Sequence, residues 1–174
     1  VFESLDISPL LRLRPKPLRT PRFILDTNLG RLARYLRLLG LDCLYQNDYD
    51  DQTVATLASE QQRIVLTRDR ALLQRKIITH GYFVRAVHPR RQVKEVLSRL
   101  DLYRLVKPFT RCTRCNGELQ PVDKPLIEHR LEPKTRKYFD TFLMCTTCKQ
   151  IYWQGSHHAR SQRLIEALTC ETPE

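Results

Sequence analysis

The sequence has no long hydrophobic run. No apolar stretch among its 174 residues approaches the roughly 20 residues that a transmembrane helix requires, which excludes a membrane-spanning segment. The start of the chain also lacks the apolar core of a secretory signal, so we expect a cytoplasmic protein with no membrane partner. Low-complexity tracts are missing too, and 41% apolar with 28% charged residues is typical of a soluble globular protein.

Acidic residues are in the minority: 19 Asp and Glu stand against 30 Lys and Arg, giving a formal net charge of +11. The excess is spread along the chain, with five basic against two acidic residues in 1–22, fourteen against nine in 23–105, and eleven against eight in 106–174. This balance favours a polyanionic partner, of which nucleic acid is the commonest. The alternative is that the charge only aids solubility.

Prolines divide the chain. Four of them fall within residues 1–22, with Arg and Lys between them, and this spacing prevents a regular helix. We predict an extended basic arm or linker there; the first residue is valine, which fits a piece of a longer protein. A second boundary at Pro108 separates a domain at 23–105 from a C-terminal unit at 106–174.

Between residues 23 and 105, short apolar runs alternate with amphipathic segments. Strands are predicted at 23–26, 41–45, 64–66 and 82–87, and helices at 29–39, 50–61, 70–76 and 91–100. This alternation indicates an α/β fold, with a mostly parallel sheet flanked by helices. One more helix is predicted near the C-terminus, at 157–168.

Aspartates follow three of the predicted strands. Asp26 ends the first strand, Asp50 and Asp51 follow the second, and Asp69 follows the third. Since the carboxyl ends of parallel strands share one edge, these carboxylates could together hold Mg²⁺ or Mn²⁺, which can activate water against a phosphodiester. We expect Asp26 and Asp69 to bind the ion, with Asp50 or Asp51 beside them. The alternative is that each aspartate only caps a helix.

Arginines accompany these acids on the first predicted helix and around Asp69. The candidates for holding the flanking phosphates are Arg31, Arg34, Arg37, Arg68 and Arg70. The first hypothesis is therefore a metal-dependent nuclease that hydrolyses phosphodiesters. The second is a non-catalytic adaptor that docks on structured RNA such as tRNA or the ribosome.

Four of the six cysteines form two Cys-x-x-Cys pairs, Cys112/Cys115 and Cys145/Cys148, with 29 residues between them. Two such pairs complete a tetrahedral zinc site, and without a secretory signal they favour zinc over disulfides. Four thiolates leave no open position, so this zinc should be structural. The long separation requires an extended loop or extra strands, and a redox dithiol is the alternative.

Aromatic residues follow the second cysteine pair. Tyr152, Trp153, His157 and His158 could stack on unpaired bases and aid RNA binding. Alternatively, Trp153 packs the cysteine unit against the first domain.

Sequence strings add a family resemblance. FILDTN at the first strand and TRD after the third resemble the PIN nuclease superfamily. The strings LGRLARYLRLLGLD, YDD, IVLTRDRALL, HGYFVRA, RCTRCNGELQPV and IYWQGSHH resemble the Mut-seven C-terminal RNase domain family more closely, over about residues 22–168. The resemblance implies a PIN-like domain with an appended zinc ribbon and metal-dependent ribonuclease activity. Asp26, the Asp50/Asp51 pair and Asp69 match the acidic positions of the family.

The resemblance also has implications at both ends of the first domain. Many PIN nucleases carry a fourth acid after the fourth strand, but residues 86–89 read AVHP, which implies one firmly held ion and a second only with RNA bound. Some relatives carry an N-terminal ubiquitin-like domain, which could precede residues 1–22. A regulatory protein partner would also fit this nuclease class.

Overall fold

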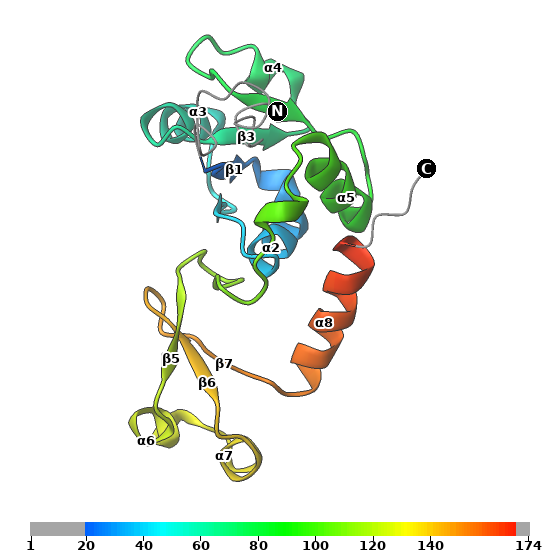
Figure 1. The fold of residues 1–174 in the computed structure, drawn as a ribbon. Helices are drawn as coiled ribbons and strands as arrows, with labels where there is room; N and C mark the ends of the chain where they lie inside the picture. Colours follow the sequence, from blue (N-terminus) through cyan, green and yellow to red (C-terminus); the bar gives the residue numbers. More distant parts are fainter. Residues whose placement is uncertain (1–19, 170–174) are drawn as a thin grey trace, which may run out of the picture.

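The computed structural model describes residues 20–169, which contain two sheets (Figure 1). The first sheet has four parallel strands in the order β2-β1-β3-β4. They are β1 (Phe23–Leu25), β2 (Cys43–Leu44), β3 (Ile64–Thr67) and β4 (Gly81–Phe83). The predicted basic arm lies outside the described residues, apart from residues 20–22.

Helices cover both faces of this sheet. They are η1 (Thr27–Leu29), α2 (Gly30–Leu38), α3 (Asp51–Glu60), α4 (Arg70–Leu73), α5 (Pro89–Arg99) and η2 (Tyr103–Leu105). Because side chains alternate along a strand, Phe23 and Leu25 pack into the core under α2 and α5, whereas Ile24 packs with Val54 of α3 and Leu72 of α4. The predicted α/β class, with a parallel sheet flanked by helices, is confirmed.

The fourth strand ends earlier than predicted, because the last residues of the predicted strand bond to a helix instead. Glu95 of α5 accepts the backbone N–H groups of Arg85 and Ala86, at 2.9 and 2.8 Å, and the hydroxyl of Tyr82 at 2.7 Å. Burial would raise the pKa of Glu95, but these N–H groups lower it, which keeps the carboxylate charged. Helix α5 begins at Pro89, where proline is favoured in the first turn.

The second sheet is antiparallel; two of its strands lie between the cysteine pairs and the third follows the second pair. Its strands are β5 (Leu119–Val122), β6 (Phe142–Cys145) and β7 (Ile151–Trp153). Three short helices connect β5 to β6, namely α6 (Lys124–Ile127), η3 (Glu128–Arg130) and α7 (Pro133–Tyr138). Of the open alternatives, extra strands rather than a bare loop occupy this stretch. Its core is small, with Ile127, Phe142 and Ile151 as the buried members.

Helix α8 (Ser156–Thr169) runs from the end of β7 back to α5 (Figure 1). Ile165 and Leu168 are buried in the same core as the residues of α2 and α5. The predicted division at 23–105 and 106–174 stays a prediction, and α8 connects the C-terminal part to the first core. Within residues 20–169, no helix has the length and apolar character to cross a bilayer.

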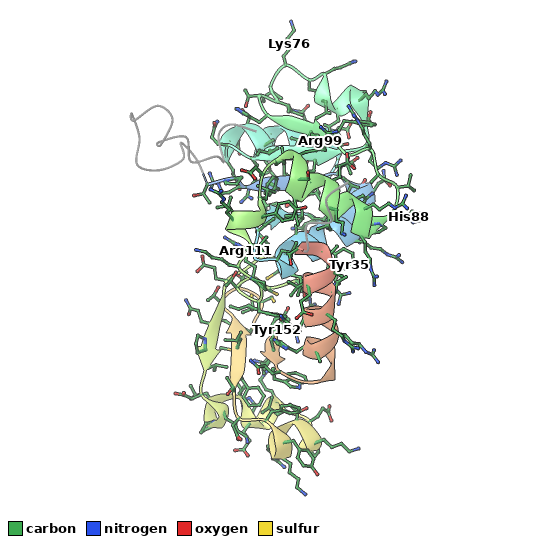
Figure 2. The ribbon with its side chains drawn as sticks, turned by 45° about the vertical axis from the view of Figure 1, so that its right-hand side comes forward. Tyr35, Lys76, His88, Arg99, Arg111 and Tyr152 are labelled. Atoms are coloured by element: carbon green, nitrogen blue, oxygen red, sulfur yellow. The ribbon has the colours of Figure 1, made fainter. Side chains whose placement is uncertain are left out.

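Asp42 connects the two sheets. Its carboxylate lies 2.6 Å from Arg63, 3.5 Å from Arg111 and 2.9 Å from the side-chain nitrogen of Asn116. Arg111 stands at the junction between the two parts (Figure 2). Burial would raise the pKa of Asp42, but the bonds from Arg63 and Asn116 and the charges of both arginines outweigh it and lower the pKa. No pattern in the sequence indicated a role for Asp42.

The variant Asp42→Asn is expected to lower the free energy of unfolding at pH 7 by about 2–3 kcal/mol, because buried Arg63 loses its charged partner. Since folding lowers the pKa of Asp42, this stabilisation is fully present above the unfolded pKa and is lost as pH falls through the folded pKa. The difference between wild type and variant should therefore shrink below about pH 4. Urea unfolding at pH 7 and pH 3 measures it; an unchanged difference would contradict this role.

Candidate active site and metal centre

The strand order creates a switch point between β1 and β3. The chain leaves β1 for β2 on one side and leaves β3 for β4 on the other. In open parallel sheets, the crevice outside the carboxyl ends of the strands at such a point is the usual place for a ligand. Asp26 directly follows β1, and Asp69 stands two residues after β3. The fold therefore directs both aspartates to the switch point.

Thr67, at the end of β3, connects these two aspartates. Its hydroxyl donates to Asp26 Oδ2 at 3.0 Å and accepts the backbone N–H of Asp69 at 2.8 Å. Asp26 Oδ1 accepts the N–H of Thr27 at 2.5 Å and caps η1, while Asp69 Oδ1 accepts the N–H of Ala71 at 2.7 Å and caps α4. Asp26 is buried and Asp69 is exposed. Both aspartates therefore cap helices and lie together.

Asp50 and Asp51 lie at the start of α3, after β2. Asp50 Oδ1 accepts the N–H of Thr53 at 2.7 Å and caps α3, and the hydrogen bonds from Thr53 lower the pKa of Asp50. Asp51 lies 3.6 Å from the guanidinium of Arg75, with both side chains less than half exposed. Each of the two acids thus has a local structural role as well as its place on the sheet edge.

The candidate acids and the cysteines differ in how closely their ligand atoms gather. Among the described side chains, the four cysteines are the only group of three or more His, Cys, Asp or Glu placed to hold a metal ion, and their ligand atoms all lie within 4.8 Å of one another. The four acids do not converge to that extent. Within the same residues, no Lys or Arg forms an ion pair with Asp26 or Asp69, so neither carboxylate is neutralised by a guanidinium there.

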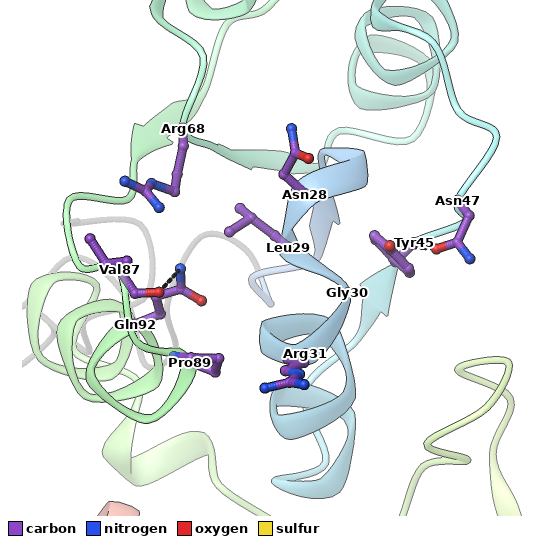
Figure 3. Close-up of a pocket in the computed structure, with 10 residues that line it drawn as sticks. All are labelled: Asn28, Leu29, Gly30, Arg31, Tyr45, Asn47, Arg68, Val87, Pro89 and Gln92. Atoms are coloured by element: carbon purple, nitrogen blue, oxygen red, sulfur yellow. Dashed lines mark hydrogen bonds between the residues drawn. The ribbon is translucent and has the colours of Figure 1, made fainter.

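A cavity of about 520 Å³ adjoins this edge of the sheet (Figure 3). Asn28 and Arg31 line it from η1 and α2, and Arg68 lines it from the loop after β3. Tyr45 lines the cavity too, and its hydroxyl lies 2.8 Å from the carbonyl oxygen of Thr27. This cavity therefore offers two exposed guanidinium groups beside the loops that carry Asp26 and Asp69.

Glycine at position 30 permits the side chain of Tyr45 to lie close to the backbone of α2 in this cavity. A Cβ there would lie 2.6 Å from the hydroxyl oxygen of Tyr45, which a neighbouring ring cannot accommodate without moving. Gly30 begins α2, so the first turn of α2 and Tyr45 are packed directly together. Tyr45 carries no signal of this contact in the sequence, because a strand-end tyrosine resembles an ordinary half-buried residue.

The remaining candidate arginines lie in different surroundings. Arg34 is exposed on α2, and Arg70 is exposed over the ring of Phe83, 5.3 Å from its centroid. Arg37 does not fit the expectation that it binds substrate, because its side chain is only 4% exposed. Its guanidinium donates to four backbone carbonyl oxygens, those of Cys43, Tyr45, Thr113 and Arg114. Arg37 therefore joins the two parts of the chain and is not available to a phosphate.

The four cysteines gather as predicted. The sulfur of Cys112 lies 3.6 Å from that of Cys148, and the sulfur of Cys115 lies 3.4 Å from that of Cys145. These distances are far longer than a disulfide and are close to the sulfur separation of about 3.8 Å that tetrahedral zinc–thiolate geometry requires. N–H groups of the second pair outweigh the effect of burial and lower the pKa of Cys145 to about 7. The cluster could hold a zinc ion.

The two cysteine pairs have the same backbone geometry. In each, the residue after the second cysteine, Asn116 or Lys149, has a positive φ and donates its N–H to the carbonyl of the first cysteine. In the first pair, the Asn116 side chain also accepts the N–H of Cys43 at 2.8 Å. This bond fixes the first cysteine pair against β2 of the parallel sheet.

Tyr152 contacts the cysteine cluster. Its hydroxyl lies 3.0 Å from the sulfur of Cys112, and burial together with this contact raises the pKa of Tyr152. Trp153 is 36% exposed, and His158 stacks on Phe109 with the ring centroids 4.2 Å apart. The side chain of His157 lies outside the described part. Tyr152 was predicted as a base-stacking residue, but its contact with a candidate metal ligand has no signal in the sequence.

Comparisons with known proteins give one match. A family model described as the Mut7-C RNAse domain matches residues 21–165, which include all the candidate acids and all four clustered cysteines. Searches of curated proteins and of solved structures each returned no match.

Proposed function

Because the chain belongs to the Mut7-C RNAse domain family, we propose that it is a metal-dependent ribonuclease whose active site lies at the switch point between β1 and β3. The observation that carries the proposal is the Asp26–Thr67–Asp69 connection at this point. It supports two carboxylates acting together, in a chain whose net charge of +11 favours RNA as partner.

The donor set fits Mg²⁺ or Mn²⁺. These ions take oxygen ligands, and Mg²⁺ is commonly bound by one or two carboxylates with water in the remaining positions. In this proposal Asp26 and Asp69 hold the ion, and Asp50 or Asp51 contacts it through water. The exposed pair between Asp51 and Arg75 is weak enough to be exchanged for such a contact.

When bound, the ion would supply an activated water and stabilise the leaving oxygen of the phosphodiester. The protein's own contribution is positional. Thr67 holds the Asp26 carboxylate and the Asp69 backbone in one arrangement, and Arg31 and Arg68 hold the flanking phosphates by charge-assisted hydrogen bonds. Arg34 and Arg70 extend this positive surface.

The four cysteines, in the same proposal, hold a structural zinc. They leave no position open for a water, so zinc chemistry does not contribute to cleavage. We retain the division into a nuclease unit at 23–105 and a zinc ribbon with a C-terminal helix at 106–174, the second aiding RNA binding.

Product analysis tests the ribonuclease proposal. Zinc-loaded protein incubated with end-labelled RNA and Mn²⁺ is expected to release fragments with 5′-phosphate and 3′-hydroxyl ends, because water and not the 2′-hydroxyl attacks phosphorus. Cyclic 2′,3′-phosphate ends would contradict this mechanism. Salt-sensitive RNA binding without any cleavage would instead favour the non-catalytic adaptor.

A further inference from the structure

A second cavity, of about 660 Å³, lies where three distant segments meet. Tyr35 and Leu38 line it from α2, Leu143 and Trp153 from the second sheet, and Leu164 from α8. Figure 1 shows α8 passing from β7 to α5, so that this helix bounds one side of the region. Arg31 lines this cavity as well as the cavity at the candidate active site.

Aromatic side chains form part of the wall of this cavity. Five of its lining residues carry rings: Tyr35, Phe109, Tyr152, Trp153 and His158. Phe109 and His158 are already stacked on each other, with an angle of 23° between their planes. The indole of Trp153 is 36% exposed, so a flat ligand could reach it from solvent. Such a wall suits a ligand with a planar ring.

The charges of the cavity are all of one sign. Arg31, Arg34 and Arg111 line it, and none of the lining residues is Asp or Glu. Arg111 is partly engaged by Asp42 at 3.5 Å, but Arg31 and Arg34 are exposed. The cavity is therefore complementary to a ligand that joins a planar ring to a negative charge.

We propose that this cavity binds an unpaired nucleotide of RNA, with the base against Trp153 and the phosphate held by Arg31 and Arg34. The inference rests on the proposed ribonuclease function and narrows its substrate class to RNA with a single-stranded segment. Bases in a duplex are stacked on their neighbours and cannot enter such a site, whereas unpaired bases stack readily on aromatic side chains. Since Arg31 lines both cavities, one strand could occupy the two together.

Trp153 is the only tryptophan of the chain, so its fluorescence reports on this cavity directly. In zinc-loaded protein without added Mg²⁺ or Mn²⁺, a short single-stranded RNA is expected to quench the emission. It should also bind at least about 10-fold more tightly than a blunt duplex of the same sequence. The omission of Mg²⁺ and Mn²⁺ keeps this measurement independent of cleavage. Equal affinity and equal quenching by the two RNAs would overturn the proposal.

A pair of variants extends the test. Trp153→Ala should weaken binding of labelled single-stranded RNA by about 5- to 100-fold, measured by fluorescence anisotropy. Tyr138→Ala removes an aromatic side chain that is 66% exposed on α7 and does not line the cavity, and it should bind as wild type does. Unchanged binding in both variants would overturn the subsite. Preferential single-strand binding without any Mn²⁺-dependent cleavage would support the subsite and refute the ribonuclease proposal.

Discussion

Asp69→Asn is expected to lower the Mn²⁺-dependent rate of RNA cleavage at least about 100-fold, because it removes one of two charged ligands from an ion that supplies several kcal/mol of transition-state stabilisation. Asparagine is also a good helix N-cap, so the bond to the N–H of Ala71 that begins α4 can be kept. The variant therefore changes charge with little expected change in folding. Initial rates on labelled RNA at saturating Mn²⁺ measure the effect.

Asp48→Asn is the matched control. Asp48 is exposed in the loop after β2, close in sequence to Asp50, and its substitution removes the same charge. We expect it to cleave RNA at the wild-type rate. If Asp69→Asn and Asp48→Asn had the same activity as the wild type, Asp69 would have only its helix-capping role.

Loss of zinc is expected to unfold the second sheet. The buried core of β5, β6 and β7 is small, and structural zinc contributes apparent binding free energies of about 10–16 kcal/mol in small zinc domains. Cys145→Ser should therefore abolish one equivalent of bound zinc and remove hydrogen-exchange protection from β6. Residues of β3, such as Val65, should remain protected, because they lie in a separate hydrophobic cluster. Elemental analysis and hydrogen exchange read out both effects.

Cys43→Ala is the control for this experiment. Cys43 is buried in β2 and does not belong to the four-cysteine group, so its removal should leave the zinc content unchanged. Retention of protected β6 amides in zinc-free protein would contradict a structural role for the metal.

Local patterns predicted the parallel sheet and the cysteine cluster well, for physical reasons. The apolar run of β3 and the 3.6-residue periodicity of α2 are direct consequences of burial, and the structure buries the apolar side chains of both elements. A Cys-x-x-Cys pair turns back on itself through local backbone geometry, so the spacing alone brings each pair of sulfurs together.

Contacts between distant segments were not predictable in the same way. Arg37 shares the spacing of its exposed neighbours Arg31 and Arg34, yet it is buried because carbonyl groups of the first cysteine pair meet it. Asp42 had no assigned role, since Arg63 becomes its partner only in the assembled parallel sheet and Arg111 only once the second part docks. Burial of Ile165 beside α2 and α5 likewise depends on the return of α8.

Metal binding at the candidate active site tests the account most directly. Titration of Mn²⁺ into zinc-loaded protein, followed by electron paramagnetic resonance, should show one bound Mn²⁺ in the wild type and in Asp48→Asn. The affinity should fall at least about 10-fold in Asp69→Asn, because a carboxylate ligand is lost. Equal Mn²⁺ affinity in all three proteins would contradict the claim that Asp26 and Asp69 together form the cation site.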